Sequence, residues 1–98
     1  MKNILRKSAR GQDCLVRIPG ICNHNPETTI LAHRNGAGMG RKHNDLFGAF
    51  CCSDCHSFVD GGWTRTDYTL TEVLRYHFEG IFRTQQWWID NNMIGELK

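Results

Sequence analysis

The sequence has 98 residues, of which 40% are hydrophobic and 22% charged, and its formal net charge is +2 at pH 7. This length fits one small domain, which buries only somewhat more than about 60% of its unfolded surface and therefore gains from a metal or disulfide staple. The first residues lack the apolar stretch of a signal peptide and no segment is apolar enough to span a membrane, so we expect a cytoplasmic protein with no membrane partner.

Positive charge is concentrated in two short segments. Residues 1–11 are predicted to form a basic N-terminal arm with a short helix ending near Gly11, and residues 12–98 a single domain. A second basic cluster, Arg34, Arg41 and Lys42, lies in a glycine-rich loop. Either cluster alone is typical of a solvated surface. Because both flank the cysteines and histidines described below, they favour a nucleic-acid partner. The cations of the arm are Lys2, Arg6, Lys7 and Arg10.

The first half of the domain is predicted to contain β structure. Residues 14–18 are a short β-rich run closed by the turn pair Pro19-Gly20, which predicts a hairpin with Cys14 at one end and Cys22 at the other. Residues 28–33 are rich in β-branched residues and predict a strand that ends at His33. The glycine-rich loop at residues 35–40 would let the backbone approach a ligand closely.

A half-site for a metal follows the apolar residues 46–50. In Cys52-Ser53-Asp54-Cys55-His56, two cysteines two residues apart can hold one Zn²⁺, and a short helix is expected from His56 toward Asp60. A closed structural zinc site needs four ligands, which Cys14 and Cys22 would complete. In a reducing compartment such cysteine pairs more often bind a metal than form disulfides.

Three alternatives concern these same residues. His56 could replace one cysteine in a Cys₃His site, and His24 is close enough in sequence to Cys22 to approach the metal. The remaining cysteine, Cys51, is interpreted as a small buried hydrophobic residue. A thiol-redox protein that uses the Cys-x-x-Cys pair is disfavoured because the sequence has no βαβ pattern.

The longest predicted element is a helix that begins around Leu70 and fades at residues 91–92. Thr69 and Glu72 fit a capping box at its start. Gly80 costs about 1 kcal/mol relative to Ala within a helix, which predicts a close packing contact there. His77 is expected to be a hydrogen-bonded core histidine. The side chains with helical spacing on one face are Leu70, Val73, Leu74, His77, Phe78, Ile81, Gln85 and Trp88.

The order of a cysteine pair, a strand-end histidine, an asparagine in the next loop and Cys-x-x-Cys-His resembles the zinc-containing HNH nuclease superfamily. The likeness is greatest to the short YbcO-like nucleases of lambdoid phages and prophages, and more distant to the recombination-enhancement nuclease Ref. It covers nearly the whole chain. The matching strings are Arg6-Lys7-Ser8-Ala9-Arg10-Gly11, Val16-Arg17-Ile18-Pro19-Gly20, Asn25-Pro26-Glu27-Thr28, Leu31-Ala32-His33, Cys52-Ser53-Asp54-Cys55-His56, Glu79-Gly80 and Arg83-Thr84-Gln85.

This resemblance implies a small α+β fold, with a zinc-stapled ββα-metal core of the HNH type and a C-terminal helix. It implies that His33 is the general base, that Asn44 fixes the loop orienting this base, and that His56 binds a catalytic cation, Mg²⁺ or another divalent ion. A neutral histidine can take a proton from water, and a divalent cation stabilises the charge that develops on the phosphate. The four cysteines, Cys14, Cys22, Cys52 and Cys55, would hold a separate structural Zn²⁺.

The implied activity is phosphodiester hydrolysis of nucleic acid, as a DNA endonuclease in phage recombination or DNA processing. Such an enzyme would act in the cytoplasm of a bacterial host, with a phage or host recombination protein as a further partner. DNA, RNA and the strand structure of the substrate are not distinguished by the sequence.

The chain departs from the common HNH pattern at two places. Many HNH enzymes have an acid directly before the first histidine, where this chain has Ala32. Asp60, one helical turn after His56, is the candidate for the missing ligand, although a surface carboxylate at a helix end is equally expected. The absent acid supports a second hypothesis, a noncatalytic zinc module that binds nucleic acid or a phage or host protein.

The second departure concerns the loop asparagine. His43 and Asp45 adjoin Asn44, so the loop offers three polar side chains for one role.

Overall fold

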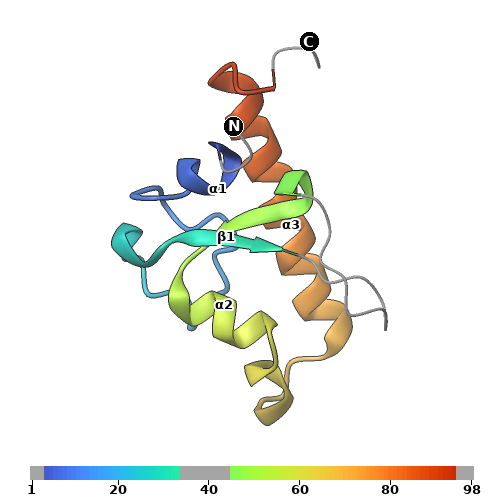
Figure 1. The fold of residues 1–98 in the computed structure, drawn as a ribbon. Helices are drawn as coiled ribbons and strands as arrows, with labels where there is room; N and C mark the ends of the chain where they lie inside the picture. Colours follow the sequence, from blue (N-terminus) through green and yellow to red (C-terminus); the bar gives the residue numbers. More distant parts are fainter. Residues whose placement is uncertain (1–3, 34–44, 95–98) are drawn as a thin grey trace.

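The computed structural model describes residues 4–33 and 45–94 as a small α+β structure (Figure 1). Helix α3 runs along most of the molecule, with a two-stranded sheet beside it and the short helix α2 below the sheet. No helix among these residues has the length and apolarity required to cross a membrane. The elements are α1 (Ile4–Ser8), η1 (Pro26–Thr28), β1 (Ile30–His33), η2 (Asp45–Phe47), β2 (Gly48–Cys51), α2 (Ser53–Val59), η3 (Gly62–Arg65) and α3 (Leu70–Asp90).

Strands β1 and β2 pair antiparallel, with Ile30 opposite Cys51 and His33 opposite Gly48. All four residues of β2 are buried, because α3 packs against this strand, and Ala49 and Cys51 share a hydrophobic cluster with the segment before η1. The pairing places the end of β1 next to the start of β2, and helix α2 begins two residues after β2 ends. The predicted strand is therefore present, with His33 at its last position.

Helix α3 has the predicted capping box, since the Thr69 amide donates to Glu72 Oε1 at 2.7 Å and the Glu72 amide donates to Thr69 Oγ1 at 3.2 Å. His77 is buried and Nε2 hydrogen-bonds the Ala32 carbonyl at 3.1 Å, as expected of a core histidine. Gly80 is also buried, and a Cβ at this position would lie 2.7 Å from Val16 Cγ2 and 3.0 Å from Val16 Cα. The predicted close contact at Gly80 is confirmed.

The predicted apolar face of α3 is wrong at Leu70 and Phe78, which are 52% and 44% exposed. A two-stranded sheet covers only a narrow stripe of the helix, and Thr84 occupies that stripe instead. The Thr84 hydroxyl accepts a hydrogen bond from the amide of Phe50 at 2.9 Å and donates one to the Gly80 carbonyl at 2.7 Å. A polar side chain of α3 thus satisfies a backbone amide of β2 inside the core.

The segment between α1 and η1 is not the predicted hairpin. Leu15 donates a single backbone hydrogen bond to Phe50 at 2.8 Å, and the chain then folds on itself, with the amides of Ile21 and Cys22 both donating to the Ile18 carbonyl. Arg17 has a left-handed φ of 54°, which breaks the strand. Two other boundaries differ. A 3₁₀ turn capped by Asn25 delays β1 to Ile30, and α2 begins at Ser53, three residues before His56, because Cys52 caps it.

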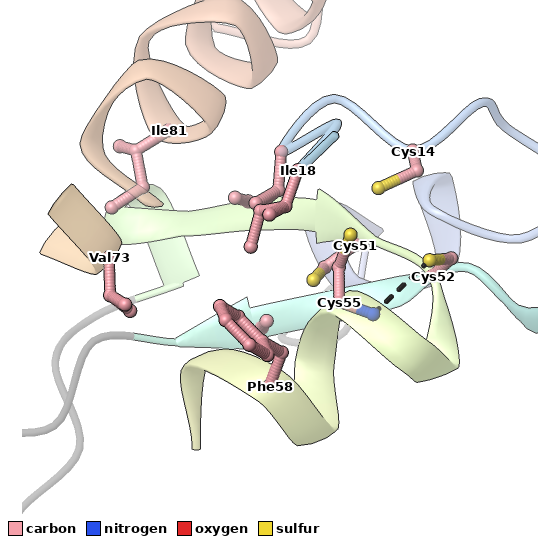
Figure 2. Packing of buried hydrophobic residues seen from close by; sticks show 11 residues of the cluster. Cys14, Ile18, Cys51, Cys52, Cys55, Phe58, Val73 and Ile81 are labelled. Carbon is pink, nitrogen blue, oxygen red and sulfur yellow. Dashed lines mark hydrogen bonds between the residues drawn. The ribbon is translucent and has the colours of Figure 1, made fainter. Parts of the chain in front are cut away.

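Two hydrophobic clusters hold these elements together. The larger one contains the cysteines together with Val16, Ile18 and Phe58, and Figure 2 shows it between α2, β2 and α3. The smaller one joins Ala9 to Leu31, Phe50 and Trp88. Trp88 Nε1 donates to Ser8 Oγ at 2.8 Å, so α1 and the turn after it lie against the last turns of α3. Trp88 is fully buried in this cluster, and Trp87 packs against it while remaining partly exposed.

Candidate metal centre and histidine site

The four predicted cysteine ligands come from two separate parts of the chain. Cys14 and Cys22 lie in the folded segment before η1, and Cys52 and Cys55 lie at the start of α2. Their sulfur atoms are all within 4.8 Å of one another, and those of Cys22 and Cys52 are 3.9 Å apart. A tetrahedral site with Zn–S bonds of about 2.3 Å requires S···S separations of roughly 3.8 Å. The thiol cluster therefore fits a metal ion such as zinc.

Backbone amides around the cluster are oriented toward sulfur. The amides of Arg17, Asn23 and Cys55 donate to cysteine Sγ atoms at 3.5, 3.5 and 3.3 Å, the first to Cys14 and the other two to Cys52. Figure 2 shows the bond that closes the first turn of α2. Such N–H···S contacts stabilise thiolates, which are the form that binds a metal.

Burial and mutual hydrogen bonds shift the pKa values of these thiols in different directions. Hydrogen bonds from Cys51 and Cys55 lower the pKa of the Cys14 thiol, and the hydrogen bond to Cys14 raises the pKa of Cys55. Burial raises the pKa of Cys22 to about 11. Four thiolates this close together would repel one another, so a bound cation such as zinc would be needed to keep all four ionised.

The other residues considered as ligands, Cys51 and His24, lie outside the group of four cysteines. Cys51 lies outside the group of four, is 0% exposed and belongs to the hydrophobic cluster, as interpreted from the sequence. His24 is exposed, and Nδ1 lies 3.7 Å from Cys22 Sγ. No disulfide joins any of the five cysteines.

A second polar group lies at the end of β1. His33 Nε2 and Asp45 Oδ1 are 2.6 Å apart, and Arg6 Nε donates to the same oxygen at 3.1 Å. The side chains of His33 and Asp45 are 11% and 16% exposed, whereas that of Arg6 is 58% exposed. Burial acts to raise the pKa of Asp45, but hydrogen bonds from His33 and Arg6 outweigh it, so the pKa lies below its usual range. Asp45 is therefore a carboxylate at neutral pH.

The other predicted site residues are placed as follows. His56 is half-buried in α2, and its amide donates to the Cys52 carbonyl at 2.9 Å. Asp60 is exposed and caps the end of α2, with its amide donating to the His56 carbonyl. Among residues 4–33 and 45–94, the four cysteines are the only group of three or more potential metal ligands, so His56 and Asp60 form no such group. Asn44 and His43 lie outside the described residues, as do Lys2, the glycine-rich loop and its basic cluster.

Ala32 precedes His33 and is 1% exposed, and its carbonyl accepts the bond from His77. The position that holds an acid in many HNH enzymes is thus turned into the core.

The contact between Arg6 and the histidine site was not predicted from the sequence. Arg6 and Asp45 are 39 residues apart, and the sequence indicates only a basic arm and a polar loop. The antiparallel pairing of β1 and β2 could have indicated that Asp45 lies next to His33. If His33 ends one strand, the residues just before the partner strand must lie beside it, and Asp45 is the acid nearest to that position.

The chain is similar in sequence and fold to proteins already known. The family model described as "Putative nuclease YbcO" matches residues 3–93. Two curated relatives, "Putative nuclease YbcO" from Escherichia coli K12 and "Putative nuclease ybcO" from Enterobacteria phage 82, are each 41% identical over 100 aligned residues, which span 92% of this chain and 95% of the relative. A solved structure titled "Structure of a putative bacteriophage protein from Escherichia coli str. K-12 substr. MG1655" is 42% identical, with a TM-score of 0.74, and the match covers 91% of this chain and 100% of that one.

Proposed function

This chain belongs to the family described as "Putative nuclease YbcO", and on that premise we propose that it is a metal-dependent nuclease of the HNH type that cleaves DNA. The observation that carries the mechanism is the placement of His33. It lies at the end of β1, opposite Gly48 at the start of β2, with one ring nitrogen hydrogen-bonded to an ionised carboxylate. The succession of strand, strand and helix supports the ββα-metal assignment.

In the proposed reaction, His33 accepts a proton from water as the water oxygen attacks phosphorus. The bond between phosphorus and the leaving sugar oxygen then breaks, and that oxygen takes a proton from solvent. General-base catalysis of this kind contributes about 10²- to 10⁴-fold to the rate. The residues of the chain thus provide the base, and Asn44 is proposed to orient it from the loop before η2.

Two metal ions have distinct roles in this proposal. Cys14, Cys22, Cys52 and Cys55 would hold a structural Zn²⁺ that joins the segment before η1 to α2. His56, together with Asp60, would bind the second ion. A bound Mg²⁺ or similar cation would stabilise the negative charge on the phosphate. The buried Ala32 supplies no carboxylate, so the second ion would depend on α2 and on ligands from the substrate or water.

Charge and family support a nucleic-acid substrate. Arg6 lies at the histidine site itself, and Lys7 and Arg10 are exposed close by in the chain. Cations beside the base would hold the backbone of the substrate. A relative from a phage supports a role in phage recombination or DNA processing, in the cytoplasm of a bacterial host and with a phage or host recombination protein as partner.

Two observations favour a second candidate, a noncatalytic zinc module that binds nucleic acid or a phage or host protein. The described residues include no three-ligand group around His56, and the position before His33 is a buried alanine. Such a protein would retain the thiol-bound metal and would bind DNA without cutting it.

A cleavage assay separates the two candidates. Supercoiled plasmid and single-stranded DNA are incubated with protein carrying its zinc, with Mg²⁺, Mn²⁺ or further Zn²⁺ added, or with none. The wild type should nick DNA only with added cation, and His33→Ala should lose about 10²- to 10⁴-fold in rate at unchanged zinc content. Asp67→Asn, an exposed change in the connection before α3, is the control and should be as active as the wild type. Binding without cleavage under every condition would favour the noncatalytic module, and equal activity of His33→Ala and wild type would remove His33 as the base.

A further inference from the structure

We propose that Asp45 is a positioning residue for His33, and that Arg6 from the N-terminal helix holds Asp45 in place. This inference rests on the proposed function for its catalytic meaning, but its structural content concerns three side chains alone. One carboxylate oxygen, Asp45 Oδ1, accepts hydrogen bonds from His33 Nε2 at 2.6 Å and from Arg6 Nε at 3.1 Å.

The place of Asp45 is fixed by the fold. It is the first residue of η2, which leads directly into β2, and β2 is paired with the strand that ends at His33. The next residue, Leu46, accepts a hydrogen bond on its carbonyl from Gln85 Nε2 at 2.6 Å, so α3 holds the same turn. The backbone of His33 belongs to a paired strand, and the turn that carries Asp45 is hydrogen-bonded to α3. The Asp45 carboxylate is therefore held in place relative to the imidazole. It sets the position of the ring.

The hydrogen bond also decides which nitrogen of His33 can act. An ionised carboxylate only accepts hydrogen bonds, so Nε2 must carry the proton. In the neutral ring Nδ1 then has the free electron pair and is the atom that can take a proton from water. When it does so, the ring becomes a cation, and the adjacent carboxylate stabilises that charge. Asp45 therefore orients the base before the proton transfer and balances its charge afterward.

Arg6 connects the N-terminal helix α1 to the histidine site. Helix α1 and the turn after it are docked through buried Ala9 and the bond between Ser8 Oγ and Trp88 Nε1, so Arg6 projects from a fixed support. Its guanidinium shares Oδ1 with His33, which keeps the carboxylate ionised and limits its rotation. Arg6 is itself mostly exposed, and a surface ion pair of this kind is weak, so its effect should be smaller than that of Asp45.

Two readouts test the assignment. In the first, kcat and KM for plasmid nicking are compared for wild type, Asp45→Asn and Asp45→Ala, with Asp67→Asn as the matched control. Asn keeps an acceptor and loses the charge, whereas Ala loses both. We expect Asp45→Ala to lower kcat by about 10- to 100-fold, by analogy with the loss of the hydrogen-bond partner of a metal-binding histidine, and Asp45→Asn to lie between Ala and wild type. KM and zinc content should not change.

In the second readout, proton NMR follows the His33 Nε2–H resonance. A short bond to a carboxylate shifts this resonance downfield and slows its exchange with water. It should be present in the wild type and absent in Asp45→Ala. Unchanged kcat in Asp45→Ala, or a persisting downfield resonance, would overturn the proposal. If the wild type cleaves no DNA at all, the proposed function fails, whereas the resonance still decides whether Asp45 holds His33.

The part of Arg6 is tested by a double-mutant comparison. Arg6→Ala should lower kcat less than Asp45→Ala does, and adding it to Asp45→Ala should cause no further loss, because Arg6 acts through Asp45. A full additional loss in the double variant would remove Arg6 from the positioning chain.

Discussion

Replacing Gly80 tests the close packing between α3 and the segment that carries Cys14 and Cys22. Replacing a glycine by alanine inside an exposed helix stabilises the fold by about 1 kcal/mol through helix propensity. At Gly80 the new Cβ would lie 2.7 Å from Val16 Cγ2 and 3.0 Å from Val16 Cα, and Val16 is fully buried. These contacts involve a backbone atom and a stiff side chain, so neither can move away easily.

Overpacking of this kind costs about 1–3 kcal/mol. Set against the gain of about 1 kcal/mol from propensity, the net expectation for Gly80→Ala is a loss of roughly 1 kcal/mol in the free energy of unfolding. For a domain of this size, that is a fall of about 4–8 °C in Tm. The measurement is urea unfolding at a fixed excess of zinc, because metal binding contributes to apparent stability.

The control is Phe82→Ala in the same helix, a residue 67% exposed, whose replacement should change stability by no more than about 0.5 kcal/mol. In a Val16→Ala background the closest contact is gone, so Gly80→Ala should cost less there, by about 1 kcal/mol. A Gly80→Ala protein that is more stable than wild type by the full propensity gain would refute the reasoning, and so would additivity of the two changes.

The remaining predictions concern the metal and pH. Purified protein should hold one tightly bound zinc per chain, and chelation should unfold most of it, because the binding energy of about 10–16 kcal/mol is comparable to the whole stability of a typical domain, about 5–15 kcal/mol. Cys55→Ser should lose this metal in elemental measurement, whereas the equally buried Cys51→Ala should keep it; equal loss in both would contradict the four-cysteine site. The folded pKa of Asp45 lies below the ordinary 3.8, so its stabilising contribution is complete above that value and is lost as pH falls through the folded pKa. The stability difference between wild type and Asp45→Asn should therefore be largest near neutral pH and shrink below about pH 4; a difference that stays constant on acidification would count against the assignment.

Some elements could be predicted because their determinants are local. The capping box of Thr69 and Glu72 specifies the start of α3 within four residues of sequence. The turn at Cys52 offers its sulfur to the amide three residues later, so the same spacing that makes a metal half-site also caps α2. The β-branched run before His33 gives a strand because such side chains fit a pleated sheet.

Other features were wrong or missing because their causes are distant in sequence. Residues 14–18 do not form the predicted hairpin with residues 21–22, because the Leu15 amide bonds to Phe50 of β2 and Cys14 lies with the cysteines at the start of α2. Leu70 and Phe78 have helical spacing with the core residues, but the sheet they would cover is only two strands wide.

The sequence by itself determined the metal-binding residue types, the order of the nuclease motifs and the family, because spacing and identity along the chain are local quantities. Only the tertiary structure decided that four thiols from two segments meet within 4.8 Å, and that Arg6, His33 and Asp45 share one hydrogen-bonded site. Contacts across 30 or 39 residues depend on how β1, β2 and α3 pack, and packing responds to volume and backbone pairing throughout the chain.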